Sequence, residues 1–196
     1  MPRPRLLPRE TIIPAAMRQF WRRGYHATSM EDLILATGAS RAAIYEEIGG
    51  KRALYLACFP AYQAHIVAPA LRGMDAPGAG LEAIAFYFET QISLAEAEGL
   101  PGLGCLVANA ATETAPHDLA VATCVEAHNS RLQHAFEWAL GNACPSLDRA
   151  ERTDLAAFIT LTAQGLWSMS RGLESAKPLR THGHVLINLL RARLSI

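Results

Sequence analysis

The chain has 196 residues, of which 51% are hydrophobic and 18% are charged, and its formal net charge of zero argues against a protein that binds nucleic acid through overall positive charge. A chain of this length can bury a sizeable core, as one compact domain or as a small domain beside a larger one. No apolar run reaches the ~20 residues of a membrane-spanning helix and the amino terminus lacks the apolar stretch of a signal peptide, so we expect a cytoplasmic protein with no membrane segment.

Positive charge is concentrated near the amino terminus. Residues 1–55 carry nine Lys and Arg against five Asp and Glu, whereas residues 56–196 carry nine against thirteen. Arg3, Arg5 and Arg9 lie among prolines. Two interpretations fit them: a flexible arm that reaches a phosphate backbone or a minor groove, or a solvated terminus without a role.

The first expected helix has apolar residues at helical spacing and ends at Gly24. They are Ile13, Ala16, Met17, Phe20 and Trp21. Pro14 would break a helix that began at Pro8, so we place the start at a Thr11 cap, where Pro14 falls in the first turn.

Residues 28–51 predict two short helices joined by a glycine turn. Thr28 and Glu31 form a capping-box pattern at the start of the first helix, and Gly38 ends it. Ser40 can cap the second helix, whose Ala43 and Ile44 are expected to pack inward. This is a helix-turn-helix pattern, which favours DNA binding.

Residues 13–59 resemble the amino-terminal domain of the TetR family of transcriptional regulators. The positions in register with that family are Ala16, Phe20, Gly24, Tyr25, Thr28, Ser29, Met30, Leu33, Ala36, Gly38, Ser40, Ile44, Tyr45, Gly49, Lys51 and Leu54. The resemblance implies a homodimer that holds two such units against palindromic double-stranded operator DNA. It also implies that the protein releases the operator when a small molecule enters the carboxy-terminal domain. Repression is the family's usual mode of control.

The second short helix, residues 41–47, is expected to enter the major groove. Its one long cation, Arg41, is our choice for a base or phosphate contact, and the resemblance implies phosphate contacts from Thr28, Tyr45 and Lys51. The full set expected to contact DNA is Thr28, Ser40, Arg41, Ala42, Tyr45, Glu46 and Lys51. Glu46 either faces water or accepts from a cytosine amino group, and with Glu47 it predicts modest affinity or an unusual operator.

The rest of the chain predicts helices and no strand. A fourth helix begins at Lys51 and must kink or end at Pro60. Further patterns cover residues 81–97, 103–115, 118–140, 148–175 and 179–194. We therefore expect an all-α fold: a three-helix helix-turn-helix domain at residues 1–55, followed by an α-helical ligand-binding and dimerisation domain at residues 56–196.

A pocket for an unidentified small-molecule effector is expected in the second domain. Cys105, Asn109 and Glu113 share one face of an otherwise apolar helix, and the segment that starts at Gly104 is similar to a Gly-Cys-Leu segment in one group of TetR-like regulators. The candidate pocket residues are Tyr62, His65, Phe86, Phe88, Cys105, Asn109, Glu113, His128 and Trp167. For each of them a place in the plain core or on the surface remains the alternative.

The four cysteines, Cys58, Cys105, Cys124 and Cys144, lie too far apart to indicate a disulfide framework or a metal site. Cys105 fits either a small buried residue or a thiol that senses electrophiles or oxidants. No nucleophile, phosphate-loop or metallohydrolase motif occurs, so we expect neither an enzyme nor a cofactor. The alternative function is a TetR-fold ligand-binding or redox-sensing protein with weak or lost operator binding.

The last two helices are expected to form the interface of a homodimer, as a four-helix arrangement of two helices per subunit. The expected interface residues are Leu155, Phe158, Ile159, Thr162, Leu166, Met169, Leu173, Leu179, Leu186, Leu189 and Leu190. A monomeric core around the same residues is the alternative.

Overall fold

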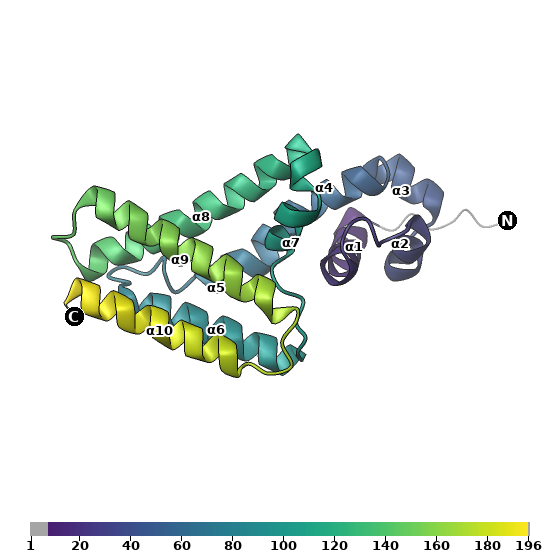
Figure 1. Cartoon of the computed structure of the whole chain (residues 1–196). Helices are drawn as coiled ribbons and strands as arrows, with labels where there is room; N and C mark the ends of the chain where they lie inside the picture. The colour runs from purple at the N-terminus through teal and green to yellow at the C-terminus, as the bar shows by residue number, and fades with distance from the viewer. Residues whose placement is uncertain (1–7, 196) are drawn as a thin grey trace.

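The computed structural model describes residues 8–195, and the regular elements in that range are all helices (Figure 1). The amino-terminal part comprises α1 (Arg9–Arg23), α2 (Met30–Thr37), α3 (Arg41–Ile48) and α4 (Lys51–Tyr62). The carboxy-terminal part continues with η1 (Gln63–Val67), α5 (Ala68–Leu71), α6 (Leu81–Glu98), α7 (Leu106–Glu113), η2 (Ala115–His117), α8 (Leu119–Ala143), α9 (Arg149–Ser170) and α10 (Lys177–Leu194). The predicted all-α fold is confirmed. The predicted basic residues Arg3 and Arg5 lie outside the described residues.

The small helices α1, α2 and α3 form one end of the molecule, and α4 leads from them into the larger helical body (Figure 1). An aromatic cluster joins α1 to α4: the ring of Tyr55 lies 5.0 Å from Phe20, 4.8 Å from Tyr25 and 5.1 Å from Phe59, measured between centroids. Because α4 packs on both parts of the chain, the boundary predicted between residues 55 and 56 falls inside a shared helix. That division stays a prediction.

Helix α1 begins earlier than expected. Its amino cap is Pro8, and the amides of Thr11 and Ile12 donate to the Pro8 carbonyl oxygen at 2.9 and 3.3 Å. Pro14 is therefore inside the helix, where its ring removes one hydrogen bond to Glu10. Glu10 is exposed, so water can replace the missing donor, and the predicted Thr11 cap is wrong.

The capping box of α2 is shifted by one residue from the prediction. Ser29 accepts from the Asp32 amide at 3.1 Å, and the Asp32 carboxylate accepts from the Ser29 amide at 2.8 Å. These contacts hold the pKa of Asp32 below its ordinary value, through the backbone and hydroxyl of Ser29 first and Arg23 after them. Both Thr28–Glu31 and Ser29–Asp32 fit the sequence pattern, and burial of Thr28 decides between them.

Of the two outcomes predicted at Pro60, a kink or an end, the helix end does not occur: α4 runs through Pro60 and becomes π-helical at Gln63–Val67. Pro60 and Pro69 remove a backbone donor on either side of this turn, which accounts for the irregular winding. The continuous stretch Lys51–Leu71, with a mean hydropathy of 1.2, is long and apolar enough to span a membrane by composition alone. It packs against α1, α3 and α8, and the core helices of folded domains pass the same test of length and composition.

Candidate nucleic-acid interface and effector site

The helix-turn-helix is built by α2, a glycine turn and α3. Gly38 has a φ of 69° and lets the chain reverse, and the Ser40 hydroxyl accepts from the Ala43 amide at 3.1 Å to start α3. Ala43 and Ile44 are buried against the other helices. The opposite face of α3 is exposed and carries the four residues predicted there: Arg41, Ala42, Tyr45 and Glu46.

Tyr45 is held at the surface by the glycine pair that follows α3. The side chain is 54% exposed, and its ring lies over Gly50, where an added Cβ would come within 2.9 Å of Tyr45 Cε1. Gly50 also has a φ of 98°, so a side chain there is disfavoured twice. The ring therefore packs against the Gly50 backbone while about half of the side chain stays exposed, as a phosphate contact requires.

Arg41 has an intramolecular partner in this structure. Its guanidinium donates to the carboxylate of Glu31 on α2, and both side chains are largely exposed. An exposed ion pair of this kind contributes at most about 1 kcal/mol, so a phosphate can displace Glu31 readily. Arg9 similarly donates to the carbonyl oxygen of Glu47 at the end of α3.

Thr28 and Lys51, both predicted to contact phosphates, have different surroundings in the structure. Thr28 is fully buried and its hydroxyl donates to the Gly24 carbonyl oxygen at 2.6 Å, so the Thr28 side chain is not available to DNA and that prediction is corrected. The Lys51 ammonium lies 4.3 Å from the centroid of the Tyr25 ring, at the start of α4. Burial lowers the pKa of Lys51, while Glu113 and Asp32 oppose that shift.

A buried polar cluster lies in the helical body, where α4 and η1 meet α7 and α8. Gln63 Oε1 accepts from Arg131 at 3.2 Å, so Gln63 Nε2 faces His128 Nδ1 as a donor at 2.8 Å. The His128 proton is then on Nε2, which points to Cys105 Sγ at 3.7 Å. Burial raises the pKa of Tyr62 well above its ordinary value, and its neighbour Cys105 adds to that shift.

Burial also raises the pKa of Cys105, against opposing contributions from the Tyr62 hydroxyl and the amides of Ala108 and Val107. The thiol is therefore neutral at physiological pH. His128 is neutral as well, because burial and then Arg131 lower its pKa to about 4. The cluster is a set of uncharged polar groups in an apolar setting, which suits recognition of a small molecule with few polar atoms.

The lowered pKa of His128 predicts a loss of stability in acid. The folded-state pKa lies below the ordinary 6.5, so the folded chain binds fewer protons, and the stability is complete above pH 6.5 and falls as the pH drops toward about 4. The total loss is roughly 3 kcal/mol. Chemical unfolding at a series of pH values should show this slope in the wild type and a flatter one in His128→Gln; equal slopes would contradict the assignment.

The other predicted pocket residues do not form one site with this cluster. Phe88 stacks on Trp167 with centroids 6.3 Å apart, inside the hydrophobic core, and Phe86 is 67% exposed. His65 is exposed on η1. Asn109 donates to the Leu103 carbonyl oxygen at 3.1 Å.

Glu113 points away from the cluster, to the turn after α1, where its oxygens accept from the Tyr25 and His26 amides at 2.9 and 2.8 Å. The predicted polar stripe of Cys105, Asn109 and Glu113 is therefore corrected, because each of the three has a separate partner. Gln63, which the prediction missed, lies in the π-helical turn, and no periodic signal in the sequence marks it.

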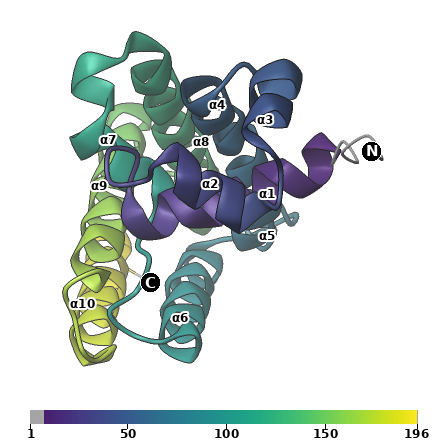
Figure 2. The ribbon, with the colours of Figure 1, turned by 90° about the vertical axis from the view of Figure 1, so that its right-hand side faces the viewer.

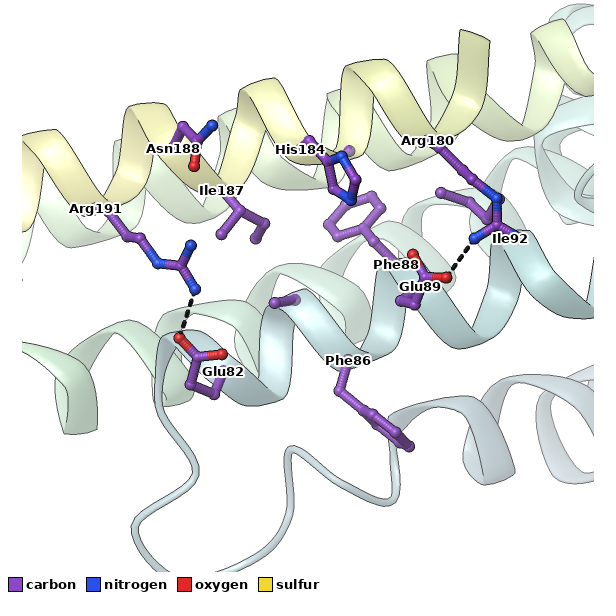
Figure 3. A pocket seen from close by; sticks show the side chains of 12 residues that line it. Glu82, Phe86, Phe88, Glu89, Ile92, Arg180, His184, Ile187, Asn188 and Arg191 are labelled. Carbon is purple, nitrogen blue, oxygen red and sulfur yellow. Dashed lines mark hydrogen bonds and ion pairs between the residues drawn. The ribbon is translucent and has the colours of Figure 1, made fainter. Parts of the chain in front are cut away.

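A groove of about 780 Å³ lies between α6 and α10 (Figure 3). Its floor includes Phe88, Ile92 and Ile187, and ion pairs of Arg191 with Glu82 and Arg180 with Glu89 cross it. Of the residues predicted to bind an effector, only Phe86 and Phe88 line this groove. It is an open surface feature between two helices, separate from the buried cluster.

An exposed apolar face runs along α9 and α10. The predicted interface residues divide in the structure: Phe158, Met169 and Leu189 are exposed, Leu155, Thr162 and Leu173 are half-buried, and Ile159, Leu166, Leu179, Leu186 and Leu190 are buried in the chain's own core. The last group is corrected, because those side chains already pack within the subunit. Leu161, 73% exposed, and Val185 were missed, because both helices are apolar on two faces.

Comparison with known proteins places this architecture. Residues 12–58 match the model of the bacterial regulatory proteins, tetR family. The chain is 29% identical over 160 residues to the uncharacterised HTH-type transcriptional regulator YezE of Bacillus subtilis (strain 168), covering 81% of this chain and 82% of YezE. It is 28% identical over 171 residues to the HTH-type transcriptional repressor ComR of Escherichia coli (strain K12), covering 84% of this chain and 80% of ComR.

A solved structure of the TetR family regulator CifR, a cysteine mutant complexed with 26-bp double-strand operator DNA, has the same fold. Its TM-score is 0.82 at 22% identity, covering 95% of this chain and 98% of CifR. The helix-turn-helix of α2 and α3 occupies the matched segment, and the helical body follows it as in the CifR structure. The chain is a member of the TetR family, a transcriptional regulator whose amino-terminal helix-turn-helix binds DNA.

Proposed function

We propose that this protein is a cytoplasmic repressor that binds a palindromic operator as a homodimer and releases it when a small molecule occupies the carboxy-terminal domain. The exposed face of α3 carries the proposal, because Arg41 and Tyr45 lie on it while the other face of the helix is buried. Figure 2 views the molecule from the end that α1, α2 and α3 form. The E. coli relative is named a repressor and the CifR structure holds operator DNA, which supports the same mode of action here.

The apolar face of α9 and α10 supports the homodimer. Phe158, Leu161, Gly165 and Met169 repeat at helical spacing on α9, and Val185 and Leu189 do so on α10; all six are exposed in the subunit. A contiguous apolar surface of this kind favours association, and a two-fold partner would cover it with its own α9 and α10. The same two-fold axis would present a second α3 to the next turn of the duplex, ~34 Å away.

The buried cluster of Gln63, Cys105, Tyr62 and His128 is the proposed effector site. Its few polar groups are neutral and lie among core residues, next to the carboxy-terminal end of α4, whose amino-terminal end directly follows the helix-turn-helix. An effector must bind one arrangement of the helices better than the other, by roughly 5.5 kcal/mol, to shift the protein from almost fully bound to almost fully released.

Selection of duplexes from a random DNA library by the purified protein tests this function. The proposal expects enrichment of an inverted repeat, with affinity that falls steeply as salt is raised. A protein carrying both Arg41→Ala and Tyr45→Ala, which leaves the core intact, serves as the matched control. Enrichment of no sequence, or equal enrichment by the control protein, would refute operator recognition through α3.

A second candidate function, electrophile or oxidant sensing through Cys105, is favoured by one observation. The Cys105 sulfur, at the amino cap of α7, lies 3.7 Å from His128 Nε2. Burial and a raised pKa oppose reactivity. Mass spectrometry after brief treatment with an alkylating agent distinguishes a sensor thiol from a core residue. Preferential labelling of Cys105 over the half-buried Cys124 supports the sensor, and the reverse order excludes it.

A further inference from the structure

Glu113, the last residue of α7, is hydrogen-bonded to the DNA-binding part of the chain. Its carboxylate accepts from two consecutive amides, those of Tyr25 and His26, at 2.9 and 2.8 Å. Hydrogen bonds to a charged acceptor are stronger than neutral ones, and two held by one carboxylate fix its orientation. The turn that connects α1 to α2 is therefore held by a residue 87 positions further along the chain.

Gly24 makes this close approach possible. An added Cβ at Gly24 would lie 2.8 Å from Glu113 Oε2, and Gly24 has a φ of 86°, which side chains disfavour. The turn thus has two independent features that suit a carboxylate: an open position at Gly24 and two convergent N–H groups. Glu113 also lies near Lys51, whose ammonium rests on the Tyr25 ring at the start of α4.

The other end of α7 is fixed at two places. Cys105, its amino cap, contacts His128 in the buried cluster. In the loop just before it, the Gly104 carbonyl oxygen accepts from Trp21 Nε1 at 3.0 Å, so α1 and the turn that follows it are hydrogen-bonded at the two ends of this short helix. Arg171 links α1 to the same loop, because its guanidinium donates to the carbonyl oxygens of Trp21 and Leu103 at 3.2 and 3.0 Å.

We infer that α7 supports the DNA-binding domain, and that Glu113 is the positioning residue through which the Tyr25–His26 turn of that domain is coupled to the Cys105–His128 cluster. This inference rests on the proposed function, because it assigns the route by which occupancy of that cluster reaches the operator-binding helices. Displacement of the Cys105 end of an eight-residue helix must move its other end, and Glu113 carries that movement to the Tyr25–His26 turn.

The test measures hydrogen exchange of the Tyr25 and His26 amides in the full-length protein without DNA. Glu113→Gln keeps the side-chain size but offers one acceptor where two donors converge, so exchange at these amides should rise about tenfold or more. Glu126→Gln, the same change at an exposed site on α8, is the matched control and should leave exchange unchanged. Asp118→Asn removes the ion pair with Arg52, another contact between the two parts, and should also leave these two amides protected.

A double-mutant cycle tests the coupling. Cys105→Met overfills the cluster and should raise exchange at Tyr25 and His26 in the wild-type background but add nothing once Glu113 is Gln. His128→Ala, which empties the cluster instead, provides a second perturbation if the first variant folds poorly.

The inference would be overturned if the effects of Cys105→Met and Glu113→Gln on amide exchange were additive. It would also be overturned if exchange at Tyr25 and His26 were unchanged in both cluster variants. Because the readout needs no DNA, such a failure is distinct from a failure to bind an operator, which would refute the proposed function alone.

Discussion

Arg41→Ala and Tyr45→Ala are each expected to weaken operator binding by about fivefold or more, because a side-chain contact to a base or phosphate contributes roughly 1–3 kcal/mol. Both side chains lie on the exposed face of α3 and neither packs in the core, so unfolding free energy should change little. Fluorescence anisotropy with a selected operator measures the affinity, and chemical unfolding measures the stability.

Two further variants sharpen this prediction. Arg149→Ala removes an exposed cation from the start of α9, far from α3 in sequence, and should leave affinity unchanged. Glu31→Gln removes the intramolecular partner of Arg41 and one negative charge near the duplex, so affinity should rise. If Arg41→Ala and Arg149→Ala weaken binding equally, the effect is one of overall charge and α3 does not read the groove.

Leu161→Glu is expected to break the dimer. Leu161 is 73% exposed at the centre of the apolar face of α9, and a buried, unpaired carboxylate on each side of a two-fold axis would repel its copy. Operator affinity should then fall by about a hundredfold or more, since the second half-site no longer binds at high effective concentration. Sedimentation velocity measures the mass of the protein, and the anisotropy assay measures the affinity.

The control for this prediction is Leu119→Glu, the same substitution at another exposed leucine, at the start of α8 and outside the α9–α10 face. Its mass in solution should equal that of the wild type. A wild-type protein that is monomeric at micromolar concentration, or a Leu161→Glu variant that remains a dimer, would show that this face is not the interface.

The sequence predicted α3 well because only one of its faces is apolar. Ala43 and Ile44 pack inward, which leaves Arg41 and Tyr45 no place except the surface. Helix α9 differs: Ile159 and Leu166 on one face and Leu161 and Met169 on another are all apolar, so periodicity alone cannot tell which set the subunit buries. The prediction consequently mixed core and surface residues.

The site in the helical body was harder to predict because it depends on contacts between distant segments. Glu113 reaches the turn after α1, and Gln63 reaches His128 across 65 positions, and neither contact follows from local spacing. The Thr28 error has a local cause: two overlapping capping patterns fit, and only the packing of Thr28 under Gly24 selects Ser29. Cys105 was predicted as either a core residue or a sensor, and its burial agrees with the first.

The mass of the complex formed with a selected operator duplex tests the central claim most directly. Native mass spectrometry at low ionic strength should give two chains on one duplex, and footprinting should show two inverted half-sites about one helical turn apart, ~34 Å. One chain per duplex, or no complex with any selected sequence, would contradict a two-fold pair of α3 helices reading adjacent grooves.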